Sequence, residues 1–353
     1  MSEVHLLDCT FRDGGYHTGW SFSDQMLNAW LDTCARMGLY GAEIGYLDLG
    51  TGAASQPFAA GIFRGLPHTL TDSQRAAISE TRSFRLGVMI DAKVLGGRTP
   101  CQGAQEILSA LDGFSRPIDF LRIAATAHEL GFAGQIAKKL STYTDSPKVF
   151  VNLMRAGNIP RDQLGPYVGA ALRDVPLAGF YIADSFGQML PDDVREIFGI
   201  LRGATRVPLG LHAHDNLGFG VANSMSAVEA GAQFVDGTFA GLGRGAGNAA
   251  TETLAALVNP ALSADWPSQC EEFLATHLSV LRSCHVWGNS PTYRTQALCC
   301  VHPTYAQRLS EMRNLSETNR LHCLSVISRS ERSADFDASY FESVVKNAQF
   351  NTS

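Results

Sequence analysis

Short, almost continuously hydrophobic runs alternate with longer amphipathic runs along the chain, at a spacing of roughly 30 residues. Parallel strands read in this way because helices cover their faces. The candidate strands are Val4 to Thr10, Ala42 to Tyr46, Arg85 to Ile90, Ile118 to Ile123, Lys148 to Leu153, Gly179 to Ala183, Pro208 to His212 and Phe234 to Phe239. The pattern therefore predicts consecutive β/α units.

The segments between these runs have the periodicity of amphipathic helices. The clearest examples are Ser23 to Met37, Gln102 to Leu111, Phe132 to Ser141, Pro191 to Arg202 and Gly220 to Ala230. Pro191 and the two aspartates after it fit a first helical turn, where a missing N–H costs nothing and carboxylates face the positive end of the helix dipole. Such β/α units predict a TIM barrel, with a doubly wound sheet as the alternative.

The chain changes character after Pro260, where strand-like runs stop. The helical patterns that follow are Gln269 to Leu281, Tyr293 to Glu311 and Phe341 to Phe350. We therefore predict a catalytic barrel over residues 1–262 and a helical C-terminal domain over residues 263–353.

One connection, from Leu47 to Ser79, is long and rich in Gly, Ala and Pro. Connections of this length often form lids or binding loops. The piece from Phe63 to His68 is a candidate for substrate contacts, and an ordered surface loop is the alternative reading.

Composition narrows the class of protein. The net charge is -6, no run of Lys and Arg is present, and no hydrophobic stretch approaches the length of about 20 residues that a membrane span needs. These features argue against nucleic acid or a membrane as partner and lead us to expect a cytoplasmic protein. The eight cysteines include no Cys-x-x-Cys pair, so neither a disulfide framework nor a zinc ribbon is indicated.

Two histidines lie two residues apart where the seventh hydrophobic run ends. Side chains alternate along a strand, so His212 and His214 would point the same way and could share one metal ion. The alternative is that two polar residues simply mark the strand end. Asp13, just beyond the first run, would complete a set of two imidazoles and one carboxylate that leaves positions open for water and substrate.

Two further features accompany these candidate ligands. Arg12 offers a fixed charge and a planar donor fork suited to a carboxylate or a developing enolate, although an ion pair with Asp13 is the alternative. After the eighth run, four glycines among residues 241–247 permit close backbone approach to a ligand, and Asn248 is placed to reach inward. A phosphate cradle is the other reading of this loop, but the Gly-Lys-Ser/Thr ending of a P-loop is missing.

Three motifs in this order resemble the DRE-TIM metallolyase superfamily: Arg12-Asp13-Gly14, the run from His212 to Gly218 with Ala222-Asn223-Ser224, and the run from Gly241 to Asn248. The superfamily includes 4-hydroxy-2-oxovalerate aldolase, 3-hydroxy-3-methylglutaryl-CoA lyase and 2-isopropylmalate synthase. The chain is most similar to the aldolase branch, because the glycine loop lacks the Gly-Glu-Arg of the synthases and the cysteine of the CoA lyases.

The resemblance implies a role for each matching residue. Asp13, His212 and His214 would hold a divalent ion, Mn²⁺ or Mg²⁺ with Co²⁺ as a further candidate, and Asn248 would be an additional ligand. Arg12 would stabilise a pyruvate enolate. The residues implied around the substrate are Glu43, Asn152, Ser185 and, from the C-terminal domain, Tyr293, with Tyr305 as the alternative tyrosine.

The sequence departs from the aldolases at the general base. They have a histidine three residues after the aspartate, whereas here that position is Tyr16 and His17 follows it. A neutral imidazole is the better base near pH 7, and a tyrosine with a pKa of about 10 needs activation. We therefore expect His17 to be the base, with Tyr16 or a water at the metal as alternatives.

Together these features predict a metal-dependent lyase that cleaves or forms 4-hydroxy-2-oxo acids from pyruvate and an aldehyde. By resemblance, an acylating aldehyde dehydrogenase is a candidate partner and a homodimer the expected assembly. Two other functions stay open: a Claisen-type acyl-CoA enzyme, and a catalytically silent scaffold barrel.

Overall fold

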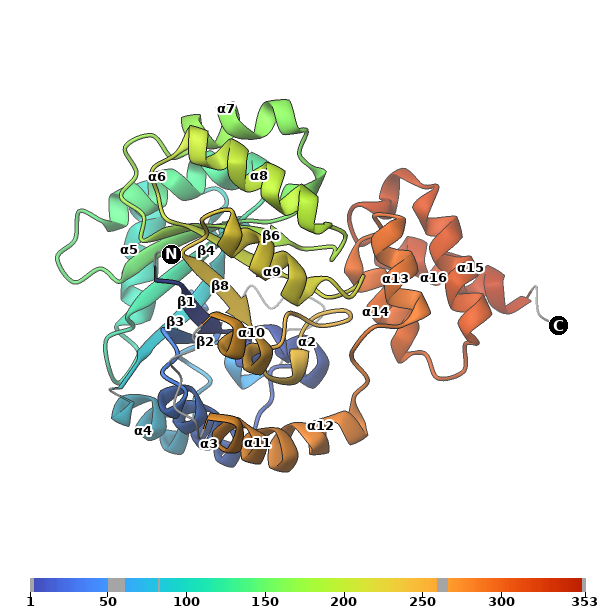
Figure 1. The fold of residues 1–353 in the computed structure, drawn as a ribbon, viewed down its shortest axis with the longest axis horizontal. Helices are drawn as coiled ribbons and strands as arrows, with labels where there is room; N and C mark the ends of the chain where they lie inside the picture. The colour runs from blue at the N-terminus through green and yellow to red at the C-terminus, as the bar shows by residue number, and fades with distance from the viewer. Residues whose placement is uncertain (1–2, 50–60, 82, 259–265, 351–353) are drawn as a thin grey trace.

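The barrel is closed and built from parallel strands that neighbour one another in sequence order (Figure 1). The computed structural model describes residues 3–49, 61–81, 83–258 and 266–350. Its strands are β1 (His5–Asp8), β2 (Gly41–Tyr46), β3 (Arg85–Asp91), β4 (Phe120–Ala125), β5 (Lys148–Leu153), β6 (Gly179–Asp184), β7 (Leu209–Ala213) and β8 (Phe234–Gly237). The predicted TIM barrel is confirmed.

Helices cover the outside of the barrel. Those between strands are α3 (Asp24–Arg36), α4 (Asp72–Glu80), α5 (Pro100–Leu111), α6 (Leu130–Leu140), α7 (Arg161–Ala171), α8 (Pro191–Ala204) and α9 (Gly220–Glu229), and α10 (Thr251–Val258) follows β8. In α8, Pro191 occupies the first turn as predicted. Val194, Ile197, Phe198 and Leu201 of α8 are buried at helical spacing. One apolar stripe therefore fixes this helix on the sheet.

Short helical turns occupy several loops at the carboxyl ends of the strands. They are α1 (Thr10–Asp13), α2 (Gly15–Thr18), η1 (Ile62–Arg64), η2 (Ala92–Leu95), η3 (Ala127–Glu129), η4 (Ala156–Asn158) and η5 (Phe239–Gly241). The sequence pattern extended the first strand to Thr10, which is wrong. Asp8 Oδ1 accepts the Thr10 N–H at 2.9 Å, so this amide bonds to a side chain and the backbone turns into α1.

The barrel interior has two layers of different character. At the amino ends of the strands, a buried cluster of Leu7, Phe120, Phe150, Tyr181 and Phe234 fills the lumen. Gly210 makes room for it, because a Cβ there would lie 2.7 Å from the Tyr181 ring. The guanidinium of Arg122 sits over that ring, 4.2 Å from its centroid, and begins a charged layer above the aromatic one.

The C-terminal residues form two groups of helices. The helices α11 (Trp266–Phe273), η6 (Leu274–Leu278) and α12 (Ser279–Cys284) join the barrel core, where the Phe273 and Phe239 ring centroids are 5.2 Å apart. The helices α13 (Pro291–Leu298), α14 (Pro303–Glu311), α15 (Glu317–Ser328) and α16 (Ala338–Phe350) enclose a second core. A further turn, η7 (Glu331–Ser333), precedes α16. The domain boundary that we predicted at residue 262 lies outside the described residues and stays a prediction.

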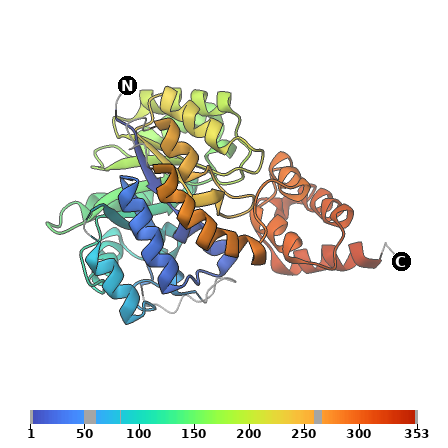
Figure 2. The ribbon, with the colours of Figure 1, turned by 60° about the horizontal axis from the view of Figure 1, so that its bottom comes forward.

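The second helical group stands at one side of the barrel, beside the loops that follow β7 and β8 (Figures 1 and 2). Two glutamines make the connection. Gln307 donates to the Tyr16 backbone carbonyl at 2.7 Å, and Gln296 accepts from the Asn216 side chain. The C-terminal helices therefore brace two loops at the carboxyl end of the barrel.

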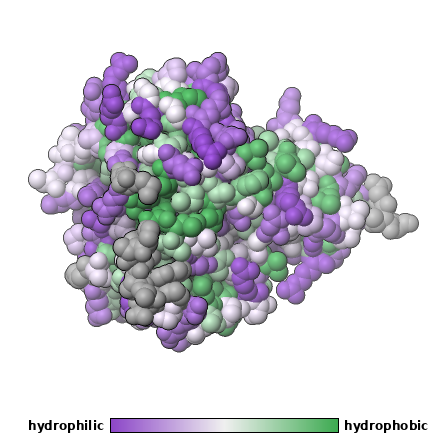
Figure 3. All heavy atoms as spheres, in the orientation of Figure 1, coloured by the Kyte–Doolittle hydropathy of each residue, from purple (hydrophilic) through white to green (hydrophobic). Residues whose placement is uncertain are grey.

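On the face of the molecule seen in Figure 3, hydrophilic residues predominate around the outline and hydrophobic residues lie mainly toward the middle. None of the helices in the described ranges is both long enough and apolar enough to span a membrane.

Candidate active site

Two histidines and one aspartate face one another at the carboxyl end of the barrel. The Oδ2 atom of Asp13 lies 3.5 Å from Nε2 of His212 and 3.9 Å from Nε2 of His214. All three side chains are buried. Metal bonds of about 2.1 Å separate neighbouring ligand atoms by roughly 3.0–3.5 Å, so these side chains need little movement to share one ion.

The other ring nitrogen of each histidine is already engaged. His212 Nδ1 lies 2.9 Å from Asp236 Oδ2, and His214 Nδ1 lies 3.2 Å from the carbonyl oxygen of Arg244. Since both partners are acceptors, each Nδ1 carries a proton, and in the neutral ring each Nε2 presents a lone pair toward Asp13. A carboxylate behind a histidine is the usual support of a metal-binding imidazole.

Asn248 completes the cluster from the glycine loop. Its Nδ2 lies 3.1 Å from His212 Nε2, while its Oδ1 and the Oδ2 of Asp13 are buried without a hydrogen-bond partner. Gly243 leaves open the space between them, because a Cβ there would lie 1.9 Å from Asn248 Oδ1 and 3.1 Å from Asp13 Oδ2. Two orphaned oxygens, two imidazole lone pairs and an open space fit a divalent cation.

Charge in the cluster favours a cation too. Burial would raise the pKa of Asp13, but Arg12 and the two histidines outweigh it and hold that pKa well below its usual range. Burial lowers the pKa of His214 from 6.5 to about 3, so this ring is neutral at physiological pH. Burial also opposes protonation of His212, but Asp13 and Asp236 raise its pKa overall. A metal ion bound at this site would displace the proton from His212.

A chain of buried charges supports the cluster from below. Arg12 pairs with Asp13 and Glu43, both at 2.7 Å. Arg122 pairs with Asp236 at 2.6 Å and with Glu43 at 3.5 Å. Arg122 was not among the residues expected from the sequence, although an arginine inside the apolar strand Phe120–Ala125 was the available signal. Its guanidinium lies 3.4 Å from Cys9 Sγ, so Cys9, His212 and Asp236 already surround a cation and make a poor second metal site.

A small cavity of about 60 Å³ adjoins the cluster. Its walls are formed by Arg12, Asp13, Tyr16, Tyr46, Met89, Asp91, Ala124, Asn152, Met154, Ala183, Ser185, His212, His214 and Arg244. The expected residues Arg12, Asn152 and Ser185 thus line one cavity with the ligands. Glu43 does not line it, because it lies behind Arg12 as the buried partner of two arginines.

Tyr16 and His17 point to different places. Tyr16 lines the cavity, with its hydroxyl 3.3 Å from that of Tyr46. His17 does not line it; its Nε2 lies 2.9 Å from the Gly243 carbonyl, and its ring is near Trp287. Because Gly15–Thr18 is a helical turn, successive side chains point about 100° apart, and only one of the two can face the bond to be broken.

The two C-terminal tyrosines lie away from the cavity. Tyr293 is buried in the core of the second helical group, and Tyr305 donates from its hydroxyl to the carbonyls of Arg332 and Asp335. Neither lines the cavity, so the structure does not bring Tyr293 to the substrate as we expected. Two other residues of this group contact the cavity wall: His302, whose Nε2 lies 3.4 Å from Nη2 of Arg244, and Gln307, which donates to the Tyr16 carbonyl.

The loop after β2 contributes Arg64 to the surroundings of the cavity. Its guanidinium stacks over Tyr46, 3.8 Å from the ring centroid, and pairs with Asp91 at 3.5 Å. Tyr46 and Asp91 line the cavity, whereas Arg64 stands behind them. Residues 50–60 of the predicted lid lie outside the described residues.

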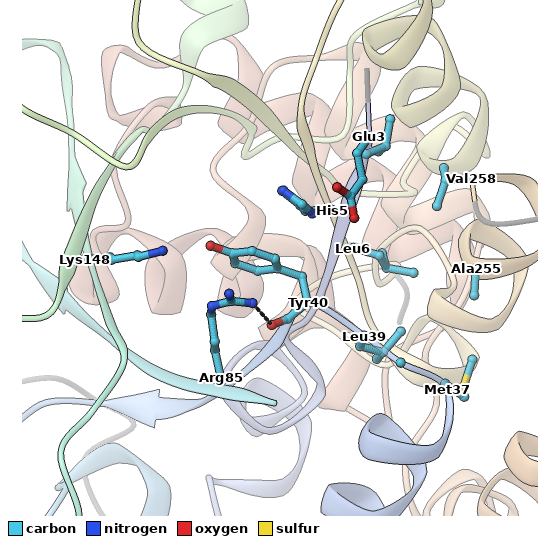
Figure 4. A pocket seen from close by; sticks show the side chains of 12 residues that line it. Glu3, His5, Leu6, Met37, Leu39, Tyr40, Arg85, Lys148, Ala255 and Val258 are labelled. Carbon is cyan, nitrogen blue, oxygen red and sulfur yellow. Dashed lines mark hydrogen bonds between the residues drawn. The ribbon is translucent and has the colours of Figure 1, made fainter. Parts of the chain in front are cut away.

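A larger pocket of about 480 Å³ opens at the opposite end of the barrel (Figure 4). Glu3, His5, Tyr40, Arg85 and Lys148 surround it where strands β1, β3 and β5 begin. Active sites of TIM barrels form at the carboxyl ends of the strands, and this pocket lies at the amino ends. The smaller cavity beside the histidines is therefore the candidate active site.

The chain is similar to known lyase sequences over most of its length. The HMGL-like family model matches residues 125–276. The chain is 33% identical to an oxaloacetate decarboxylase of Mycobacterium tuberculosis, over 72% of this chain and 69% of that protein. It is 32% identical to a 4-hydroxy-2-oxovalerate aldolase of Chloroflexus aurantiacus, over 73% of this chain and 70% of that protein.

Solved structures show the same architecture. The N-terminal domain of a putative aldolase from Bacteroides vulgatus superposes with a TM-score of 0.72 and 25% identity, covering 88% of this chain and 98% of that one. The carboxyl transferase domain of Rhizobium etli pyruvate carboxylase has a TM-score of 0.71 at 15% identity, covering 100% of this chain and 60% of that one. The second likeness concerns the fold alone.

Proposed function

Because the chain belongs to the HMGL-like family of the DRE-TIM metallolyase superfamily, we propose that it is a divalent-metal-dependent lyase that cleaves 4-hydroxy-2-oxo acids into pyruvate and an aldehyde, or joins them. The observation that carries the proposal is the cluster of Asp13, His212 and His214 beside a cavity with an arginine on its wall. Mn²⁺ or Mg²⁺ held there would draw electron density from the two oxygens of a 2-oxo acid.

Arg12 has the position to bind the carboxylate of the substrate and the enolate oxygen that develops. Its ion pairs with Asp13 and Glu43 fix the guanidinium, so little reorganisation is needed during the reaction. Asn152 and Ser185 supply polar groups on the same cavity wall. Asn152 is itself held, because its Oδ1 accepts from Arg122 at 3.2 Å.

Tyr16 is the base that the geometry favours. In the cleavage direction it removes the proton of the 4-hydroxyl, the bond between C3 and C4 breaks, and its electron pair becomes the enolate of pyruvate. The aldehyde leaves, and C3 of the enolate then takes up a proton from Tyr16, directly or through a water, which gives pyruvate and restores the base. Burial raises the pKa of Tyr46 and keeps it protonated, so its hydroxyl can donate to the Tyr16 oxygen.

The oxaloacetate decarboxylase relative supports a second candidate reaction. Loss of CO₂ from a 2-oxo acid with a carboxylate on C3 leaves the same enolate, so the same residues would serve. The two reactions differ in the leaving group: an aldehyde requires removal of a hydroxyl proton, whereas CO₂ does not. Tyr16 is therefore required as a base only for the aldol reaction.

To test the proposal, purified protein with Mn²⁺ is incubated with pyruvate and short aldehydes. In a separate experiment it is incubated with acetyl-CoA and 2-oxo acids. Formation of a 4-hydroxy-2-oxo acid supports the proposal. Release of free thiol without aldol product would establish the Claisen alternative instead. A protein that binds no metal would be the silent scaffold.

The remaining expectations belong to the same proposal. A cytoplasmic location, a homodimer and an acylating aldehyde dehydrogenase that accepts the aldehyde are consistent with an aldolase of this kind. Co-purification and light scattering test the partner and the assembly.

A further inference from the structure

Among the described residues around the cavity, Arg244 stands out as an arginine without a carboxylate partner. The three other arginines near it are paired: Arg12 with Asp13, Arg64 with Asp91, and Arg122 with Asp236. No carboxylate within the described ranges comes within 4.0 Å of the Arg244 guanidinium. Its Nε is buried without a hydrogen-bond partner. A cation in this situation carries a desolvation cost that a bound anion would offset.

The position of Arg244 sets where such an anion would lie. Its backbone carbonyl accepts from His214, so the residue is next to the ligand cluster. Its guanidinium extends over the Tyr16 ring, 5.3 Å from the centroid, and lines the cavity. Arg12 and Arg244 thus stand on the wall of one cavity, and the candidate base lies beside the second of them.

The Arg244 guanidinium also contacts the His302 ring, but this contact leaves its charge available for a bound anion. Burial, with Arg244 and Arg155 next in importance, holds the pKa of His302 well below its usual range, so the imidazole is neutral. A neutral ring 3.4 Å away does not neutralise Arg244. The C-terminal helices therefore position the arginine without satisfying its charge.

We propose that Arg244 is a specificity-determining residue that binds a second carboxylate of the substrate, so that the enzyme takes 2-oxo dicarboxylates. This inference rests on the proposed function, because it assigns the first carboxylate to Arg12 and the metal site. An aldol substrate of this class carries a carboxylate on C4, and its cleavage gives pyruvate and an aldehyde acid. A planar guanidinium suits this role because it can form two parallel hydrogen bonds to a carboxylate.

Binding of two unreactive 2-oxo acids tests the inference. 2-Oxoglutarate and 2-oxopentanoate have nearly the same shape, but one ends in a carboxylate and the other in a methyl group. Both lack a 4-hydroxyl, so neither can be cleaved by the aldol route. Isothermal titration of the Mn²⁺-loaded protein is expected to show at least tenfold tighter binding of 2-oxoglutarate.

Variants identify the group responsible. Arg244→Met should abolish the preference for 2-oxoglutarate, and Arg244→Lys should retain part of it because the charge remains. Arg155→Met is the matched control: Arg155 also acts on His302 and pairs with Asp335, but it does not line the cavity. The control should keep the ratio of the two affinities within about twofold, since surface charges contribute little.

Equal binding of the two acids to the wild-type protein would overturn the inference. So would a preference that survives in Arg244→Met, or one that Arg155→Met removes to the same extent. The aldolase proposal is judged separately, by deuterium exchange into pyruvate with the same preparations. Suppose that Arg244→Met loses the preference for 2-oxoglutarate but the wild type shows no deuterium exchange into pyruvate. That result would contradict the aldolase proposal and still support the dicarboxylate site.

Discussion

His212 and Asp236 form a 2.9 Å hydrogen bond that fixes which nitrogen of the imidazole faces the cavity. Asp236 is fully buried and also receives Arg122 at 2.6 Å, so the carboxylate cannot turn away. The bond leaves His212 Nε2 facing Asp13 and the glycine loop, where the neutral ring presents a lone pair. The proposed metal binding at this site would consequently depend on a residue that does not itself touch the ion.

Asp236→Asn is predicted to weaken Mn²⁺ binding by about 10- to 100-fold, the usual effect of removing such a support. Mn²⁺ titration by calorimetry measures this affinity, with the exposed Asp192→Asn as control.

In the wild type, the affinity for Mn²⁺ should fall as the pH drops from about 8 to about 5, because the raised pKa of His212 means that a proton competes with the ion. An affinity that does not depend on pH would contradict this account of His212.

Tyr16→Phe is predicted to reduce kcat of the aldol reaction by about 10²- to 10⁴-fold, as expected when a general base is lost. His17→Gln should retain most of the activity, because its ring faces the Gly243 carbonyl rather than the cavity. Steady-state kinetics with both variants decides between the two residues. The reverse order of effects would restore His17 as the base.

Arg122→Met is predicted to destabilise the protein by about 3–5 kcal/mol, since it leaves Asp236 and Glu43 buried without their shared partner. Urea denaturation of the metal-free protein measures the free energy of unfolding. Arg161→Met is the control, because its pairs with Asp193 and Glu196 lie near the surface and are worth little. Equal effects of the two substitutions would refute the buried charge network.

His214 gives the metal-free protein a predictable sensitivity to acid. Its pKa is about 3 in the folded state against 6.5 unfolded, so the unfolded chain binds the proton first. Its contribution to stability is therefore complete above pH 6.5 and is lost as the pH falls toward 3, at up to about 1.4 kcal/mol per pH unit. His214→Gln should show a shallower loss of stability between about pH 6 and about pH 4. An unchanged slope would mean that the ring is protonated in the folded protein.

Much of the fold could be predicted because parallel strands in a barrel are buried on both sides and read as hydrophobic runs. The polar residues that follow such runs, Asp13 and His214 among them, end up together because the carboxyl ends of all strands meet at one face. Periodicity in the chain thus carries information about this part of the site.

The remainder depends on turns and on contacts distant in sequence. The periodicity of the strands does not predict the helical turn Gly15–Thr18. That turn decides whether Tyr16 or His17 faces the cavity. Arg122 lies in a strand that reads as ordinary core, and its partners come from β2 and β8. The docking of Gln296, His302 and Gln307 onto the barrel depends on tertiary contacts between side chains, which no local pattern encodes.

The proposed function requires that the cluster of Asp13, His212 and His214 binds a divalent ion and that pyruvate beside it can form an enolate. Mass spectrometry of pyruvate incubated in D₂O with the Mn²⁺-loaded protein tests this directly, without an aldehyde or a partner protein. We predict deuterium in the methyl group with the wild type, and loss of exchange after chelation or in His212→Ala. Absence of exchange with the wild type, or exchange that persists in His212→Ala, would contradict the claim.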